Sequence, residues 1–204
     1  MRHIRAFVAI ELDDALKIAL GQIQARLKRT ANPRVARWVA PEAIHLTLKF
    51  LGDVPADRID EITGAVRRSC EAFAPFSICL SDAGCFPNPG RPRVIWVGVD
   101  GELKVLMRLQ HSVESELSRI GFPPEKRGFH AHLTLARLRR NASSRERVEI
   151  GEAVSTVEVG ASVTMTVREV SLMRSDLRPT GAVYTRLASV SLSGEQIQAE
   201  GVDK

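Results

Sequence analysis

Apolar and polar positions along the chain follow two periods, one of two residues and one of about 3.6 residues, which are typical of strands and amphipathic helices. In the first half the pattern predicts a buried strand over 5–12, a helix capped by Asp13, a strand over 44–51, a helix that begins at Pro55, and a strand over 76–80. Strands and helices therefore alternate from the start of the chain.

The same order of elements recurs in the second half. It predicts a strand over 93–99, a helix over 102–120, a strand over 129–138 and a helix near 143–155. Two alternating runs, TMTVREVSLMRS and AVYTRLASVSL, then close the chain, and the turn sequence DLRPTG between them is typical of a β-hairpin with a longer loop. The repeated order indicates an internal duplication in an α/β or α+β protein.

Composition narrows the class of protein. The 204 residues include 44% apolar residues, and 29 Lys and Arg against 24 Asp and Glu give a formal net charge of +5. These values describe a folded, mildly basic protein and exclude a disordered acidic tail, a collagen-like repeat and a disulfide miniprotein. We expect a single bilobal domain over 1–192, with the lobe junction in the Pro- and Gly-rich segment 87–93, and a polar tail over 193–204.

The cysteines and the apolar runs bear on location. Cys70, Cys79 and Cys85 are odd in number and contain no C-x-x-C spacing, which indicates reduced thiols in a reducing compartment. The apolar stretch at 6–10 is too short for a secretory signal, and no run approaches the roughly 20 apolar residues that span a bilayer. We therefore expect a cytoplasmic monomer with no membrane partner.

The tetrapeptide His-Leu-Thr-Leu occurs twice, at 45–48 and at 132–135. Because side chains alternate between the faces of a strand, the histidine and threonine of each copy share one face and the two leucines share the other. A single copy would most often be an ordinary strand. Two identical copies, each after a helix and a turn, favour a functional pair in which both strands present an imidazole and a hydroxyl to one ligand.

Two histidines suit acid–base catalysis near neutral pH, since one imidazole can accept a proton while the other donates one. Phosphodiester cleavage needs both transfers. The threonine hydroxyls can donate hydrogen bonds to non-bridging phosphate oxygens, which stabilises the charge that develops there. This chemistry requires neither a metal nor another cofactor, and we expect none. The residues alone leave open which histidine is the acid.

These motifs resemble those of the 2H phosphoesterase superfamily, which is named for two His-x-Thr/Ser-x motifs, and in particular its RNA 2′,3′-cyclic phosphodiesterase family, once called 2′-5′ RNA ligases. The resemblance extends in order over about residues 4–192, through RAFVAIEL, RWVAPEAIHLTLKFLGDV, CFPNPGRPRVIWVGVDG, FHAHLTLARL and SLMRSDLRPTGAVYTRL. It implies an α+β fold of two pseudo-symmetric lobes, with antiparallel sheets facing a central cleft and helices on the outside.

The resemblance also implies an activity. The substrate would be RNA that ends in a 2′,3′-cyclic phosphate, or a small cyclic nucleotide, and water would open the ring to a 2′-phosphomonoester. By this resemblance His45 is the proton donor, His132 is the proton acceptor, and Thr47 and Thr134 hold the phosphate oxygens. Two alternatives stay open: 2′-5′ RNA ligation, in which an RNA 5′-hydroxyl replaces water in the reverse reaction, and a non-catalytic RNA- or nucleotide-binding module.

Three further residues are candidates for substrate binding. Arg137, which the resemblance implies is a phosphate ligand, lies five residues after His132 and would face away from it in a flat strand, although a twist or bulge near the strand end would redirect it. Phe50 has the same offset from His45 and suits either base stacking or core packing. His130 shares a strand face with His132; no nearby Asp, Glu or Cys completes a metal site, so a substrate-edge role fits better.

Basic residues gather in two stretches, 26–37 and 137–147. The first contains no acidic residue and the second contains one, Glu146. If both stretches border the same cleft, they would attract an RNA backbone with salt-sensitive affinity. The alternative is that each is an ordinary solvated face of the protein.

Overall fold

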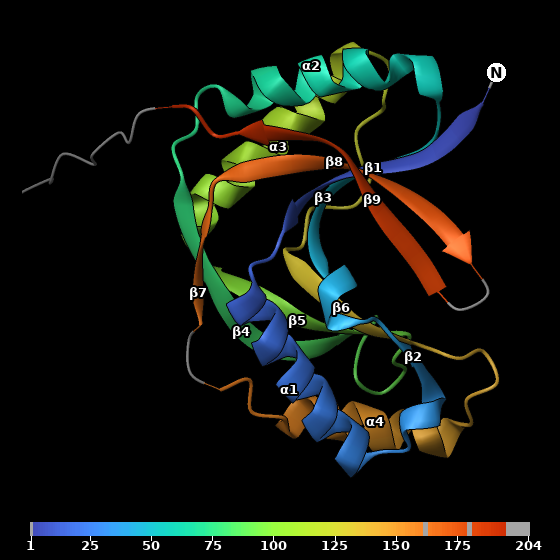
Figure 1. Ribbon diagram of the computed structural model, residues 1–204. Coiled ribbons are helices and arrows are strands. Elements are labelled where there is room, and N and C mark those ends of the chain that lie inside the picture. Colours follow the sequence, from blue (N-terminus) through green and yellow to red (C-terminus); the bar gives the residue numbers. More distant parts are fainter. Residues whose placement is uncertain (1, 161–162, 179–180, 195–204) are drawn as a thin grey trace, which may run out of the picture.

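The computed structural model describes residues 2–160, 163–178 and 181–194 and combines a large antiparallel sheet with four α-helices among them (Figure 1). The strands are β1 (His3–Glu11), β2 (Ala36–Trp38), β3 (His45–Pro55), β4 (Phe76–Phe86), β5 (Val94–Gly101), β6 (His132–Leu138), β7 (Thr164–Val167), β8 (Glu169–Arg178) and β9 (Gly181–Ser191). The helices are α1 (Asp14–Thr30), α2 (Ile59–Cys70), α3 (Leu103–Arg119) and α4 (Ser144–Thr156), with short 3-10 turns at Pro33–Val35, Pro41–Ala43 and Ala56–Arg58. The predicted α+β class is confirmed.

The sheet is symmetrical about its centre. Its strand order is β7-β4-β5-β6-β3-β1-β8-β9, with β2 paired to β6. The motif strands β3 and β6 meet in the middle, where Leu46 pairs with Leu133, the equivalent residue of the other motif. They are flanked by β1 and β5, and each of these lies before its motif strand in the chain. The sequence duplication therefore becomes a pseudo-twofold relation at the β3–β6 pair.

Helices cover each half of the sheet from the outside. We name the two halves by their motif strands: the β6 half contains β2, β4, β5, β6 and β7, and the β3 half contains β1, β3, β8 and β9. Helices α1 and α4 contact each other and the β6 half, whereas α2 and α3 contact each other and the β3 half (Figure 1). Helix α1 thus follows β1 in the chain but packs on the opposite half, so neither half is a continuous piece of sequence.

Because α1 packs on the half opposite to β1, the boundary between the two halves does not lie where the sequence pattern indicates. The segment 87–93 joins β4 to β5, which pair with each other within the β6 half. The segment 87–93 therefore does not join the two halves, contrary to the predicted lobe junction. A Pro- and Gly-rich segment indicates a turn, and such a turn can join two strands of the same half. Of the polar tail predicted for 193–204, residues 195–204 lie outside the described part of the chain.

The predicted local signals mostly survive in the fold. Asp13 caps α1, and its carboxylate accepts a hydrogen bond from the Leu16 amide at 2.9 Å. Strands β8 and β9 form the predicted hairpin, but the predicted longer loop is wrong, because their pairing extends to Arg178 and Gly181 and so includes most of the DLRPTG segment. The run over 164–175, however, is divided: β7 ends at Val167 and pairs with β4, while β8 begins at Glu169 and pairs with β1 and β9. Period-two alternation continues across the division, so the pattern does not reveal the change of partner. In the described residues no helix is both long and apolar enough to cross a membrane.

Candidate active site

The two motif strands expose their polar face as alternation predicts. Both histidines and both threonines are half-buried, while the intervening leucines lie in the core at 0–2% exposure: Leu46, Leu48, Leu133 and Leu135. In the antiparallel register set by the Leu46–Leu133 pair, His45 and Thr134 are cross-strand neighbours, as are Thr47 and His132. Neither threonine hydroxyl bonds another described residue. The structure thus brings together the four residues that the motifs single out.

Backbone carbonyls orient both imidazoles in the same way. Nδ1 of His45 lies 2.9 Å from the Ala43 carbonyl oxygen, and Nδ1 of His132 lies 2.7 Å from the His130 carbonyl oxygen. A carbonyl can only accept, so Nδ1 carries the proton in each ring. In the neutral imidazole Nε2 is then an unprotonated acceptor that is free to act on a ligand. The carbonyl two residues upstream serves this purpose in both motifs.

Aromatic rings surround His45. Phe7 stacks on the imidazole with ring centroids 4.6 Å apart, and Tyr184 meets it edge-on at 4.9 Å. Tyr184 also contacts Phe7 edge-on at 5.3 Å. Sequence reasoning did not select Phe7 or Tyr184. One signal was present, because Tyr184 is the single tyrosine of the chain and lies in an alternating strand.

A second group of rings surrounds His132. Phe86 meets the His132 imidazole edge-on at 5.0 Å and contacts His130 at 5.2 Å, and Trp96 packs against His130 at 5.0 Å. A Cβ atom at Gly84 would collide with the Trp96 indole, so the glycine makes room for this ring. His130 precedes β6, which begins at His132, so the predicted start of this strand at 129 is wrong, but the two imidazoles lie on the same side with ring centroids 6.0 Å apart. The His130 carbonyl also bonds the His132 imidazole.

Burial and neighbouring charges set the pKa values of the two imidazoles. Burial lowers the pKa of His45 below its ordinary value of 6.5; the hydrogen bond to the Ala43 carbonyl and the Glu11 carboxylate oppose this effect, and the charge of His132 adds to it. Burial likewise lowers the pKa of His132, opposed by the bond to the His130 carbonyl and assisted by the charges of His130 and Arg137. Each imidazole is therefore mainly neutral at pH 7, and the two rings are close enough to affect each other's charge.

The two sites differ in one electrostatic respect. Glu11 is the register partner of His45 on β1, and Gly98, which has no side chain, is the corresponding partner of His132 on β5. Burial opposes ionisation of Glu11, but the hydrogen bond from Arg186 at 2.6 Å and the positive charge of that guanidinium lower the pKa of its carboxyl below 4.5. An ionised carboxylate consequently favours the imidazolium of His45, whereas a guanidinium disfavours that of His132.

Arg137 lies on the same face as His132 because β6 contains a bulge. The β5–β6 register moves from Trp96–Thr134 to Ile95–Ala136 and so skips Leu135. Leu135 and Ala136 are consecutive buried residues, and the exposed Arg137 returns to the polar face. Burial raises the pKa of Tyr184, which lies on the other half of the sheet, and the positive charge of Arg137 partly opposes this effect. The predicted redirection of Arg137 is thus present.

The same irregularity precedes Phe50. The β1–β3 register skips Leu48, so Leu48 and Lys49 are consecutive buried residues and Phe50 is 54% exposed. Its ring lies 6.0 Å from that of Phe7. Core packing, one of the two interpretations of Phe50, is excluded by this exposure. Among the described residues no group of three His, Cys, Asp or Glu side chains could hold a metal ion.

Comparison with known proteins agrees with this geometry. The family model described as LigT like Phosphoesterase matches the chain twice, over residues 10–96 and 97–184, and each match contains one motif. The chain belongs to this family.

Similar proteins support the assignment. An RNA 2′,3′-cyclic phosphodiesterase of Methanothermobacter thermautotrophicus is 40% identical over 182 residues, which are 89% of this chain and 95% of that protein. One of Archaeoglobus fulgidus is 36% identical, covering 90% and 98%. Among solved structures, TT0787 of Thermus thermophilus has a TM-score of 0.79 at 30% identity, covering 95% and 100%. E. coli LigT complexed with 3′-AMP has a TM-score of 0.74 at 30% identity, covering 94% and 99%.

In this LigT-like phosphoesterase, equivalent glutamines support the two bulges. Nε2 of Gln24 on α1 donates to the Leu135 carbonyl at 3.1 Å and to the Val39 carbonyl at 2.7 Å. Nε2 of Gln110 on α3 donates to the Leu48 carbonyl at 3.3 Å. Leu135 and Leu48 are the residues that the strand registers skip. Helices outside the sheet thus contact the backbone that returns Arg137 and Phe50 to the polar face.

Proposed function

We propose that this protein is an RNA 2′,3′-cyclic phosphodiesterase that opens a terminal cyclic phosphate with water and leaves a 2′-phosphomonoester. The observation that carries the proposal is the pair of symmetry-related imidazoles. Each has Nδ1 bound to a carbonyl and Nε2 available, and each is near a threonine hydroxyl that bonds no other described residue. The names of the similar proteins support the same substrate class.

In the proposed reaction His132 and His45 transfer one proton each, without a metal. Nε2 of His132 takes a proton from water as the water oxygen forms a bond to phosphorus. The bond between phosphorus and the 3′ oxygen breaks, and Nε2 of His45 gives its proton to that oxygen. The product keeps the phosphate on the 2′ oxygen. Proton exchange with solvent then returns the protonated His132 and the neutral His45 to their starting states.

Three donors suit the charge on the phosphate. The Thr47 and Thr134 hydroxyls would donate hydrogen bonds to the non-bridging oxygens, and the Arg137 guanidinium would contribute a positive charge on the same face. Because these groups are fixed by β3 and β6, they need little reorganisation as charge develops. Phe50 would stack on the terminal base, and His130 would border the substrate beside His132.

Electrostatics supports the direction of proton transfer. The acid must be protonated before the reaction and the base must be neutral. The Glu11 carboxylate raises the pKa of His45 against the effect of burial, while the charge of Arg137 further lowers the pKa of His132. His45 is therefore the more suitable donor and His132 the more suitable acceptor, which agrees with the roles implied by the family.

We further propose that residues 1–192 act as one unit. Helix α1, which precedes the first motif strand in the chain, covers the β6 half, and helix α3, which precedes the second motif strand, covers the β3 half. Each half would lose a covering helix if the chain were cut between the two repeats. The expectations of a monomer and of a cytoplasmic location stay predictions.

The test uses an RNA oligonucleotide that ends in a 2′,3′-cyclic phosphate, incubated in chelator with the wild type, His45→Ala and His132→Ala. His111→Ala is the matched control, because His111 is exposed on α3 and lines a different cavity. The position of the product phosphate is determined by ³¹P NMR. We expect a 2′-phosphate from the wild type and the control, with rates at least about 100-fold lower for the two motif variants.

Other results would separate the alternatives. A 3′-phosphate product, or full activity in both motif variants, would contradict the proposed mechanism. Adding an RNA with a 5′-hydroxyl tests the reverse reaction, because a 2′-5′ linkage formed by the wild type and lost with His45→Ala would establish ligation at the same site. RNA binding without any turnover, unchanged in both motif variants, would favour a binding module.

A further inference from the structure

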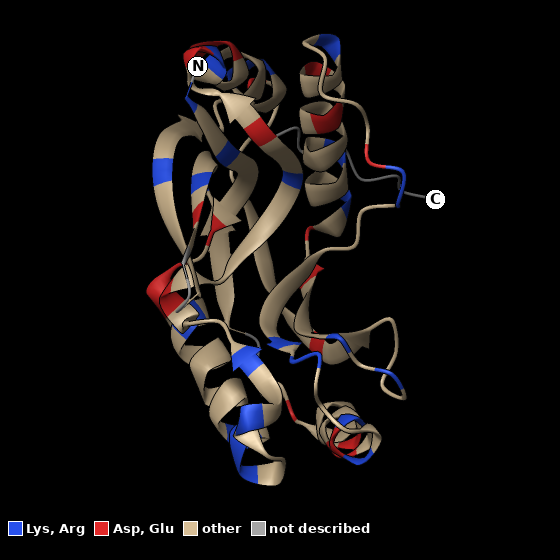
Figure 2. Cartoon of the chain, turned by 90° about the vertical axis from the view of Figure 1, so that its right-hand side faces the viewer, with Lys and Arg blue, Asp and Glu red and all other residues tan. Residues whose placement is uncertain are grey.

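A groove lined by arginines lies beside α4, in the β6 half. Its arginines come from three segments: Arg91 and Arg93 from the β4–β5 loop, Arg139 and Arg140 from the chain after β6, and Arg147 from α4. The cavity has a volume of about 770 Å³ and no acidic residue among those that line it. We call it the arginine groove. Figure 2 shows blue Lys and Arg segments on the loops in this lower part of the molecule and also on α1, with others on the strands above.

The four exposed arginines of the groove have no anionic partner within the described residues. No carboxylate of the described part of the chain lies within 4.0 Å of the guanidinium nitrogens of Arg91, Arg93, Arg139 or Arg140, although ion pairs occur elsewhere, as between Arg145 and Glu149 on α4. Like charges in one groove repel each other, and a bound polyanion would relieve that repulsion. The charge pattern therefore fits a ligand with several negative groups.

The backbone around the groove is held in place. The Arg147 guanidinium donates to four carbonyl oxygens, from residues on both of the loops that supply the other arginines: Pro92, Arg139, Arg140 and Ala142. Helix α4 also contacts the β4–β5 loop closely, since a Cβ atom at Gly151 would collide with the Pro89 carbonyl oxygen. Arg147 is thus a structural residue, and the other four arginines are presented on a braced framework.

The groove continues the strand that carries the second motif. His132 begins β6, Arg137 lies on the same face, and Arg139 follows the end of the strand. Arg139 lies seven positions after His132, which at about 3.3 Å per position of extended chain is roughly 23 Å. Stacked nucleotides rise about 3.4 Å each, so the groove is within reach of roughly the first seven nucleotides of a bound strand.

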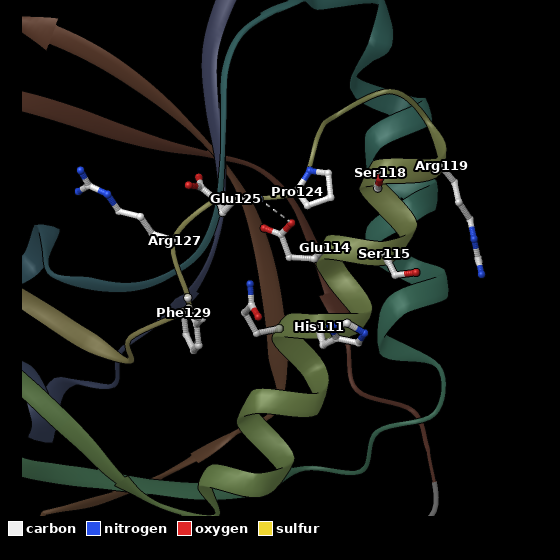
Figure 3. A pocket seen from close by; sticks show the side chains of 11 residues that line it. His111, Glu114, Ser115, Ser118, Arg119, Pro124, Glu125, Arg127 and Phe129 are labelled. Carbon is white, nitrogen blue, oxygen red and sulfur yellow. Dashed lines mark hydrogen bonds between the residues drawn. The ribbon is translucent and has the colours of Figure 1, made fainter.

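A second cavity shows that this charge pattern is not general. It has a volume of about 520 Å³ and lies between α3 and the loop before β6. Glu114 and Glu125 line it together with Arg119 and Arg127 (Figure 3). Its mixed charges do not favour a polyanion.

We propose that the arginine groove binds the sugar-phosphate backbone of the RNA whose cyclic phosphate occupies the two-histidine site. This inference rests on the proposed function and adds that the preferred substrate is an oligonucleotide and not a mononucleotide. The guanidinium groups would bind phosphates of nucleotides upstream of the reacting end. Recognition there depends on charge and is independent of base sequence.

The test compares two double variants, Arg91→Gln/Arg93→Gln and Arg139→Gln/Arg140→Gln, with wild type. The control, Arg67→Gln/Lys104→Gln, removes two exposed charges from α2 and α3 on the β3 half. KM is measured for a ten-nucleotide RNA ending in a 2′,3′-cyclic phosphate and for cytidine 2′,3′-cyclic phosphate. Losing two phosphate contacts is worth about tenfold at 0.15 M salt. We expect each groove variant, but not the control, to raise the ratio of the two KM values by about that factor.

Binding is followed independently of turnover, by fluorescence anisotropy of a labelled ten-nucleotide RNA that ends in a 2′-phosphate. Each groove variant should reduce the slope of log Kd against log salt by about 1.4, which is about 0.7 for each lost contact. If the groove variants have the same KM ratio and the same salt slope as the control variant, the proposal that the arginine groove binds RNA is wrong. Failure of the wild type to open either substrate would instead overturn the proposed function, and the anisotropy titration would still decide the groove.

Discussion

Replacing Gln24 by leucine tests how the fold holds the β6 bulge. Gln24 is 2% exposed, and its side chain donates two hydrogen bonds, at 2.7 Å to the Val39 carbonyl and at 3.1 Å to the Leu135 carbonyl. Leucine has a similar size and cannot donate either bond. The Leu135 carbonyl keeps a bond from the Val39 amide at 2.8 Å, so the substitution leaves the Val39 carbonyl as the more severely affected group.

The expected magnitude follows from these two bonds. An unsatisfied carbonyl that is buried costs about 1–3 kcal/mol, and the partly buried Val39 carbonyl falls in the lower part of this range; loss of one of two bonds at the other carbonyl costs about 0.5–1.5 kcal/mol. Gln24→Leu should therefore lower the free energy of unfolding by about 2–3 kcal/mol. Gln110→Leu removes a single bond of 3.3 Å from a residue that is 8% exposed, and should cost about 1–2 kcal/mol.

Urea denaturation of the two variants and wild type measures the effect. Gln22→Leu is the matched control, because Gln22 lies on the exposed face of the same helix and its replacement should stay within about 0.5 kcal/mol. The midpoint should change while the m-value does not. A cost for Gln24→Leu equal to that of Gln22→Leu, or smaller than that of Gln110→Leu, would refute the reasoning.

Three other outcomes are expected. Glu11→Gln removes the charge that raises the pKa of His45, so the alkaline limb of the kcat/KM profile should move to lower pH. Burial lowers the pKa of His45 and of His132 in the folded state, so below pH 6.5 the unfolded chain binds more protons than the folded chain. The free energy of unfolding should therefore decrease as the pH is lowered, by at most about 1.4 kcal/mol per pH unit for each histidine. Urea denaturation should show a weaker decrease in His45→Asn and His132→Asn. Lys49→Met leaves the Glu114 carboxylate, bonded at 2.9 Å and 12% exposed, without its partner, and thermal or urea unfolding should show a loss of about 3–5 kcal/mol that Lys49→Met/Glu114→Leu largely recovers.

Each of these has a clear contrary result. An alkaline limb that stays in place in Glu11→Gln would remove the electrostatic argument for His45 as the acid. Equal pH dependence of stability in the wild type and the asparagine variants would show that these imidazoles are not the groups that titrate. A double variant at Lys49 and Glu114 that is no more stable than the single variant would mean that the loss comes from packing and not from an unpaired charge.

The sequence by itself determined the local elements and the two motifs. Period-two alternation placed His45 and Thr47 on one face of a strand, and Asp13 marked the start of α1, because such signals depend on neighbours within a few residues. The duplication of the motif indicated a pair of equivalent groups. The family resemblance supplied their roles, which the residues alone left open.

Only the tertiary structure decided what surrounds the motifs. Glu11 lies beside His45 because β1 pairs with β3, and Tyr184 reaches the same imidazole from a strand that is 139 positions later in the sequence. The bulge that turns Arg137 toward His132 was foreseen as a possibility, but its position at Leu135 depends on pairing with β5 and on contact with α1.

The exchange of helices between the halves also has no local signal. An amphipathic helix such as α1 carries an apolar face that can cover any apolar sheet face, and its pattern does not state which. The choice depends on the sum of many contacts across the whole fold. For the same reason the sequence does not reveal that arginines from three separate segments line one groove beside α4.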